Sequence, residues 1–281
     1  MRRNPRHTLR AAVSVFVLAV LIAGLPARNA DAQIVAPPFG KADPDGWLDA
    51  EGARIRLLLA SAAPDGTIEG ALEIDLAPGF KTYWIGAGPA GIAPQLEAFG
   101  SANARLVGID YPAPVAFDEL YGWSVGYDHD VAFPLRFEMA DPEADATVRL
   151  RGVLGVCGEI CIPVSLSFEQ DVVTGMSTPL EAGRSLAAAR DALPATGADG
   201  ALTASSDGEA VTLRGNALAN ARDVYVAAPD GLTLDPPRIE DGVVRIPIVR
   251  GDAGGPATVI VRGTDGAETV YRVAIPDRSA S

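Results

Sequence analysis

Tight-turn signals recur along this 281-residue chain and constrain its fold more than any other feature. Glycine adopts positive φ without steric cost, and an aspartate side chain can bond its own backbone two residues on, so Asp-Gly steps favour hairpin turns. Five such steps occur: Asp65-Gly66, Asp207-Gly208, Asp230-Gly231, Asp241-Gly242 and Asp265-Gly266. A chain that turns back this often is predicted to form short antiparallel strands.

The segments around these turns alternate apolar and polar residues with a period of two. Such alternation, with many β-branched residues, is typical of strands that bury one face. The pattern covers residues 54–59, 68–76, 131–137, 146–154, 210–213, 224–227, 243–248, 258–262 and 269–275. Many short strands at regular spacing predict an all-β sandwich or barrel.

One segment departs from this alternation. Residues 179–193 are rich in alanine, which favours a short helix. Thr178 is suited to be its N-cap, with Glu181 three residues on as the capping-box partner, and Pro194 would end it. We interpret this segment as a helix that joins two β domains. A single continuous sandwich and a plain linker are the alternatives.

The first residues resemble a targeting signal rather than part of the fold. Four arginines precede an uncharged apolar stretch at residues 11–24, and Ala30-Asp31-Ala32 fits the small-x-small rule of signal peptidase. We expect cleavage after Ala32 and export to the periplasm. A retained membrane anchor is the alternative, but the apolar stretch is shorter than the ~20 residues that span a bilayer.

Together these features predict six segments along the chain. They are a signal peptide (1–32), an N-terminal linker (33–42), a first β domain (43–174), a helical linker (175–199), a second small β-sandwich domain (200–276) and a tail (277–281).

The charge balance excludes one class of partner. The sequence holds 23 basic and 36 acidic residues, and residues 1–32 contain five Arg and one Asp. Removing them leaves 18 basic and 35 acidic residues, a net charge of −17. Such a surface repels phosphate backbones, so nucleic acid is not an expected partner. No second long apolar stretch follows, so the exported chain is expected to be soluble.

The only two cysteines, Cys157 and Cys161, lie four residues apart in the stretch 155–163. A fully extended strand would place them ~13 Å apart, beyond the ~7 Å limit for a disulfide, so the chain must bend if they pair. Gly158 makes that bend easier. We favour reversible thiol–disulfide exchange, in which one thiolate attacks a partner and the other resolves the mixed disulfide.

Two other interpretations of the cysteine pair remain open. A purely structural disulfide would close a loop so short that it contributes only ~2 kcal/mol, against nearly 5 for a long loop. Metal binding is the second, although the exported chain offers a single histidine, His129, and closed zinc sites need four ligands. A two-thiolate Cu(I) site is compatible with the spacing. We expect neither a cofactor nor a zinc site.

Four blocks of residues resemble the N-terminal periplasmic (alpha) domain of the DsbD/ScsB family of transmembrane disulfide reductases. They are Lys81-Thr82-Tyr83-Trp84 with the Gly/Pro loop 88–94, Tyr111-Pro112-Ala113-Pro114, the segment Phe117-Asp118-Glu119-Leu120-Tyr121-Gly122 that is similar to a cap loop over the cysteines, and the motif 157–163. Together they span residues 81–163. The resemblance implies an immunoglobulin-like sandwich with the cysteine pair between strands at one end.

The resemblance also implies roles for individual residues. Cys161 would be the nucleophile and Cys157 the resolving thiol. Asp118 and Glu119 would be acidic neighbours that tune the thiol pKa, and Leu120, where some members have Phe, the apolar cap. Tyr121 would belong to the same loop.

Electrons would come from a membrane-embedded thiol reductase of the CcdA or DsbD-beta type, or from a thioredoxin-like protein, and pass to oxidised periplasmic proteins. Long members of the family continue into a multispan membrane domain and a thioredoxin-like domain. This sequence contains neither, so we expect a separate membrane partner. Cytochrome c biogenesis and copper tolerance are the processes in which such a carrier is expected.

Four further residues are candidates for the site or its surroundings. Tyr83 and Trp84 could line the redox pocket or pack in the core, and as neighbours in a strand they would point to opposite faces. Glu159, between the cysteines, could raise their pKa by its negative charge. His129 lies in an acidic stretch and is expected to be a solvated loop residue. The second β region contains no cysteine or histidine and is interpreted as a spacer or docking module.

Three functions therefore compete. The first is thiol–disulfide exchange through Cys157 and Cys161. The second is a periplasmic copper-handling or protein-binding module in which the pair is a metal ligand or a structural disulfide. The third is an interaction protein built of two sandwich domains.

Overall fold

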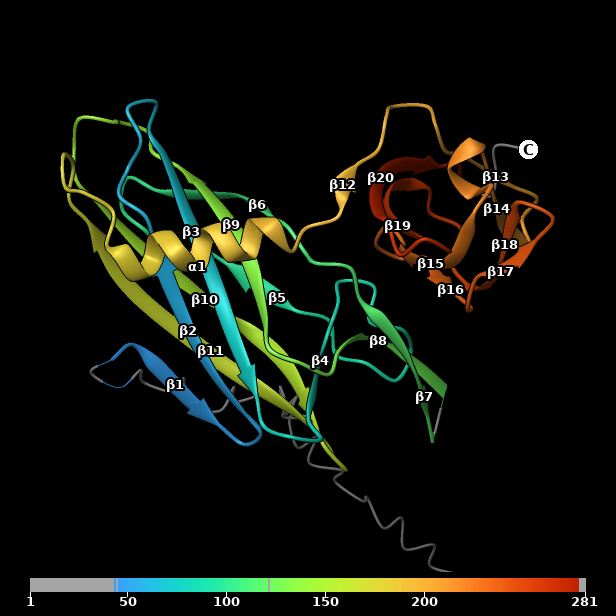
Figure 1. Ribbon diagram of the computed structural model, residues 1–281, viewed down its shortest axis with the longest axis horizontal. Helices are drawn as coiled ribbons and strands as arrows, with labels where there is room; N and C mark the ends of the chain where they lie inside the picture. Colours follow the sequence, from blue (N-terminus) through green and yellow to red (C-terminus); the bar gives the residue numbers. More distant parts are fainter. Residues whose placement is uncertain (1–42, 44, 121, 278–281) are drawn as a thin grey trace, which may run out of the picture. The chain divides into compact units, whose positions relative to one another are not determined.

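Four β-sheets and one α-helix make up the described part of the chain (Figure 1). The structure is a computed structural model that describes residues 43, 45–120 and 122–277. The predicted signal peptide, the whole predicted N-terminal linker and residues 278–281 of the predicted tail lie outside these ranges. None of the helices within them is both long enough and apolar enough to span a membrane.

The first two sheets form a sandwich. One has the order β1-β2-β3-β9-β6, with bounds Trp47–Ala50, Ala53–Leu59, Thr67–Leu76, Val131–Glu138 and Arg105–Ile109. The other has the order β11-β10-β4-β8-β7, with bounds Cys161–Val172, Ala146–Cys157, Lys81–Tyr83, Gly122–Tyr127 and Val115–Glu119, and β5 (Gln95–Glu97) also pairs with β10.

Side chains from both sheets meet in one hydrophobic core. Phe133 and Phe137 of β9 are fully buried there, together with Leu150 and Leu154 of β10. Burial of large side chains on the inner faces of two sheets is the dominant stabilising contribution in a sandwich. The predicted all-β class is confirmed.

The third and fourth sheets belong to the C-terminal part. The third has the order β12-β20-β19-β15, with bounds Ala195–Thr196, Glu268–Ile275, Gly255–Gly263 and Ala221–Ala227. The fourth has the order β13-β14-β18-β16, with bounds Thr203–Ser206, Ala210–Arg214, Val243–Arg250 and Thr233–Leu234, and β17 (Arg238–Glu240) also pairs with β18. A short 3₁₀ turn, Asn216–Leu218, follows β14. Val211, Val244 and Val259 are buried in the core these strands share.

Four of the five Asp-Gly steps turn between paired antiparallel strands, as predicted, whereas Asp230-Gly231 connects β15 and β16 of different sheets. At the step between β17 and β18, Asp241 and Gly242 have φ values of 51° and 73°. Positive φ at both central residues is the type I′ geometry that matches the twist of the flanking strands. The Asp-Gly steps therefore mark where strands end and the chain turns.

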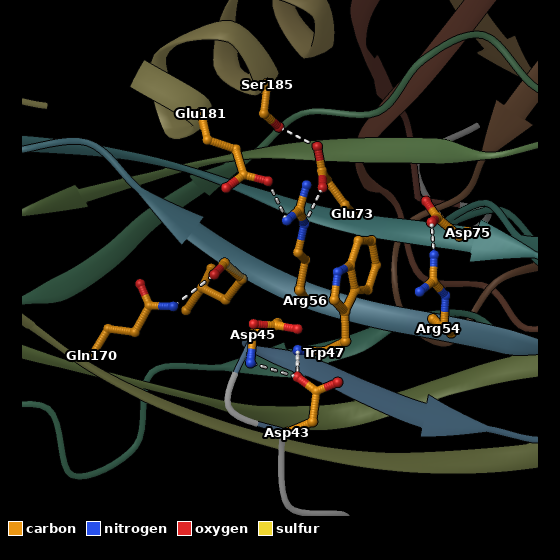
Figure 2. A network of polar contacts seen from close by, with 11 residues as sticks. Asp43, Asp45, Trp47, Arg54, Arg56, Glu73, Asp75, Gln170, Glu181 and Ser185 are labelled. Atoms are coloured by element: carbon orange, nitrogen blue, oxygen red, sulfur yellow. Dashed lines mark hydrogen bonds and ion pairs between the residues drawn. The ribbon is translucent and has the colours of Figure 1, made fainter. Parts of the chain in front are cut away.

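Helix α1 (Leu180–Asp191) forms within the predicted segment and packs on the first sheet. Figure 2 shows the polar contacts that attach it: Arg56 of β2 donates to Glu73 of β3 at 2.5 Å and to Glu181 of the helix at 2.6 Å. Ser185 also bonds Glu73. On the same side, the buried Leu186 and Ala189 contact Ala71 of β3. The helix is thus a packed element of the first sandwich as well as a connection.

The predicted capping box is wrong. Pro179 is the N-cap, and no side-chain capping hydrogen bond is present there among the described residues. The hydroxyl of Thr178 lies 2.7 Å from that of Ser61, and the carboxylate of Glu181 accepts from Arg56. Contacts with the sheet therefore replace the local contacts that the sequence pattern suggested.

Candidate functional site

The two cysteines close the hairpin of β10 and β11. Cys157 is the last residue of β10, Cys161 is the first of β11, and the two are directly paired in the antiparallel register. Their Cα atoms are 4.0 Å apart, and a disulfide joins the sulfurs. Between them the chain bends through residues 158–160, where the N–H of Gly158 donates to the carbonyl of Ile160 at 3.3 Å. The bend required for pairing is present.

The two ends of the disulfide differ in exposure. Cys157 is 2% exposed and packs in a small cluster with Tyr83 and Ala87, which Ile92 and Ala93 border. Cys161 is exposed, and Ile160 beside it is 75% exposed. An attacking thiolate must approach a sulfur along an open path, so Cys161 is the accessible end.

Tyr83 of the neighbouring strand β4 contacts the sulfur of Cys161. Its ring is fully buried, and its hydroxyl lies 3.1 Å from Sγ of Cys161. A disulfide sulfur has no proton, so the phenol is the donor of this bond. Burial, and to a lesser degree the charge of Glu119, raises the pKa of Tyr83 to about 12, which keeps the phenol protonated.

Two glycines make room for this tyrosine. A Cβ on Gly155 of β10 would lie 2.7 Å from the Tyr83 ring, and one on Gly91 would lie 2.8 Å from it. Neither distance is tolerated without movement of the ring. The glycines therefore leave room for a large aromatic ring beside the hairpin.

A compact ion pair lies on the same side of the sheet. Nζ of Lys81 and the hydroxyl of Ser124 each donate to Oε1 of Glu119 at 2.5 Å. Nζ of Lys81 also lies 4.8 Å from the centre of the Phe117 ring. Partial burial alone would raise the pKa of Glu119, but the bonds from Lys81 and Ser124 and the charge of Lys81 together hold it below its usual value.

The sheet register explains why these groups share one face. Lys81 pairs with Cys157, which pairs in turn with Cys161, and directly paired residues of antiparallel strands project to the same side. Tyr83, two residues beyond Lys81, projects the same way. The same face also carries Phe117 and Ser124, which pair with each other, and Glu119, the next inward residue of β7.

The opposite face of these strands belongs to the core. Trp84 is fully buried in the main hydrophobic cluster with Val156, and its Nε1 has no hydrogen-bond partner among the described residues. The hydroxyl of Thr82, also buried, donates to the carbonyl of Gly155 at 2.9 Å. Tyr83 and Trp84 therefore separate to the two faces, and of the two only Tyr83 reaches the cysteines.

The segment predicted to be a cap loop is the β7–β8 hairpin. Glu119 points inward, whereas Asp118 is exposed on the other face of β7. Leu120 at the tip is 86% exposed, so it does not pack over the disulfide, and the expectation of an apolar cap at this residue is not met here. The ion pair of Lys81 and Glu119 lies next to this tip. Tyr121 lies outside the described residues.

The remaining candidates lie in solvent. Glu159 is exposed in the turn between the cysteines. His129 is 63% exposed and lies 3.0 Å from Asp128, as expected of a loop histidine. No cluster of three or more His, Cys, Asp or Glu residues suited to a metal ion occurs in the ranges that the structure describes.

Sequence reasoning missed Lys81 and Ser124 as members of the site. Lys81 stood in the Lys81-Thr82-Tyr83-Trp84 block, and strand alternation puts it on the same side as Tyr83, which is the signal that could have identified it. Ser124 had no such signal, because its place depends on how β7 and β8 pair.

Comparisons with known proteins identify a matching sequence family and similar solved structures. Residues 56–172 match the sequence family described as "Thiol:disulfide interchange protein DsbD, N-terminal". The N-terminal periplasmic domain of ScsB from Proteus mirabilis has the same fold, with 21% identity, a TM-score of 0.63, and coverage of 83% of this chain and 98% of that one. The N-terminal domain of Neisseria meningitidis DsbD in its reduced form is 19% identical, with 46% and 91% coverage and a TM-score of 0.29. The search of curated proteins gave no match.

Proposed function

We propose that Cys157 and Cys161 form the dithiol–disulfide couple of an electron carrier, because residues 56–172 match the family of thiol:disulfide interchange protein DsbD N-terminal domains. The carrier receives electrons from a membrane-embedded thiol reductase or a thioredoxin-like protein and passes them to oxidised periplasmic proteins. The unequal exposure of the two cysteine residues is the observation that supports this function most directly.

The difference in exposure supports a separate role for each cysteine. In the reduced protein, the thiolate of Cys161 attacks a partner disulfide and forms a mixed disulfide, and the partner's other sulfur leaves as a thiolate. Cys157, paired with it across the hairpin, then attacks Sγ of Cys161. This restores the internal disulfide and releases the partner's second sulfur in reduced form.

Tyr83 supports the reaction at Cys161. Its hydroxyl remains a donor throughout the physiological pH range, because its pKa is about 12. A hydrogen bond to a thiolate favours the charged form. Tyr83 thereby assists Cys161 both when it attacks and when it leaves.

The other segments of the chain have supporting roles in this proposal. Residues 1–32 direct export to the periplasm, with cleavage after Ala32. Residues 43–174 form the redox domain. Residues 200–276, which contain no cysteine or histidine, serve as a spacer or docking module.

Two single-cysteine variants test the proposal. In Cys157→Ser, the exposed Cys161 should accumulate mixed disulfides with a model disulfide or with periplasmic proteins, because no second thiol resolves them. In the matched control, Cys161→Ser, the remaining thiol is buried and should trap at least tenfold less. Equal trapping by both variants, or a wild-type disulfide that dithiothreitol reduces only after denaturation, would refute the function.

A further inference from the structure

The titratable groups around Cys157 include a single cation. Five titratable side chains face or flank it: Lys81 and Tyr83 of β4, Glu119 of β7, Cys161 of β11 and Glu159 in the turn. Of these five groups, Lys81 alone carries a positive charge.

Lysine is rare in this protein. Of its 23 basic residues, two are lysines, Lys41 and Lys81, and all others are arginines. An ammonium group is a compact point charge on a flexible stem, whereas a guanidinium group is a planar fork suited to fixed bidentate pairs. The one lysine in the described ranges therefore lies where a compact positive charge on a flexible stem can interact with two anions, the carboxylate of Glu119 and a thiolate at Cys157.

Exchange creates a buried negative charge at Cys157. A donor thiolate attacks Sγ of Cys161, a new sulfur–sulfur bond joins donor and Cys161, and the Cys157–Cys161 bond breaks with its electron pair on Sγ of Cys157. Cys157 is 2% exposed, and burial penalises an unpaired thiolate. The leaving group needs a counter-charge inside the protein.

We propose that Lys81 is a positioning residue that supplies this counter-charge. In the oxidised protein its ammonium group bonds Glu119, and on opening of the disulfide it also stabilises the thiolate of Cys157, its direct partner in the sheet register. This inference rests on the proposed exchange function and assigns it a residue that acts through Cys157. The same charge serves the reverse direction, in which the Cys157 thiolate is the resolving nucleophile.

The test isolates the Cys157 thiol. In the Cys161→Ala background, the absorbance of the thiolate near 240 nm is measured as a function of pH, both in the protein that keeps Lys81 and in the Lys81→Met variant. The midpoint should rise by about one pH unit in Lys81→Met, a tenfold loss of thiolate near neutral pH. Lys81→Arg, which keeps the charge, should recover most of the shift. Arg54→Met, which removes an exposed charge paired with Asp75, is the matched control and should leave the midpoint in place.

A second arm removes the effect of an unpaired Glu119. Lys81→Met is repeated in the Glu119→Gln background, where no carboxylate is left without its partner. The rise of about one unit should persist there. A midpoint unchanged by Lys81→Met in either background, in protein whose melting profile shows it folded, would overturn the inference. Because wild-type exchange is measured separately by mixed-disulfide trapping, failure of this inference and failure of the proposed function give different results.

Discussion

The two faces of the sheet around β4 and β10 carry side chains of different kinds. The inner face holds Trp84 and Val156 in a continuous hydrophobic core. The outer face holds the disulfide, a buried tyrosine hydroxyl and an ion pair. Successive residues of one strand alternate between these environments, so a single strand provides both stability and chemistry. Substitutions on the two faces are therefore expected to affect different measurements.

The largest expected effect is on the inner face. Trp84→Ala removes a fully buried ring and should lower the free energy of unfolding by about 3–5 kcal/mol, from lost burial and the remaining cavity. Denaturant unfolding of the oxidised protein measures this loss. Under folding conditions the reduction potential should stay close to that of the wild type. A large change in potential with little change in stability would reverse the assignment of the two faces.

Tyr83→Phe should have the next largest effect, on the outer face. It removes the hydroxyl bonded to Cys161 but keeps the buried ring. In the Cys157→Ser background, we expect the pKa of the Cys161 thiol to rise by about one unit, since hydrogen bonds to charged groups are worth about 1.5–3 kcal/mol. The pH dependence of alkylation measures this pKa. An unchanged alkylation profile would show that the phenol does not assist Cys161.

Glu119→Gln should have a smaller, pH-dependent effect on stability. The folded-state pKa of Glu119 is lowered, so its contribution is complete above its ordinary pKa of 4.5 and disappears as pH falls through the lower folded value. We expect the variant to be less stable by about 1 kcal/mol at neutral pH. Melting temperatures measured from pH 7 to pH 3 should converge below pH 4.5. A difference that grows as the pH falls would contradict this sign.

Asp118→Asn should have the smallest effect and serves as the control for Glu119→Gln. Its side chain is exposed on the opposite side of β7. Removal of such a charge normally changes stability by less than about 0.5 kcal/mol. Melting temperature and exchange rate should both match the wild type. A rate change comparable to that of Tyr83→Phe would show that Asp118 contacts the partner protein.

The sequence allowed prediction of features that depend on local pattern. The Asp-Gly turns, long strands such as β3 and β9, and the bend between the cysteines all follow from neighbouring residues. The three-residue strand β4 was too short to show alternation by itself. Its pairing with β10 joins Lys81 to a residue 76 positions away, which no local pattern encodes.

Two errors have related physical causes. The capping box was expected from the spacing of Thr178 and Glu181, but both side chains found partners in the first sheet. Leu120 was expected to cover the cysteines from resemblance alone, yet it is solvated at a hairpin tip. Whether a distant segment packs against the side chain decided both outcomes, and the local sequence does not show this.

The hairpin that carries the cysteines has a kinetic consequence. Twelve consecutive residue pairs hold β10 and β11 together up to the disulfide itself, so breaking the sulfur–sulfur bond leaves the two thiols as neighbours. Their effective molarity stays high, because no hinge or loop closure precedes ring closure. Any covalent adduct with a visiting protein should therefore be short-lived, and turnover should be limited by encounter and departure of the visitor rather than by re-formation of the bond.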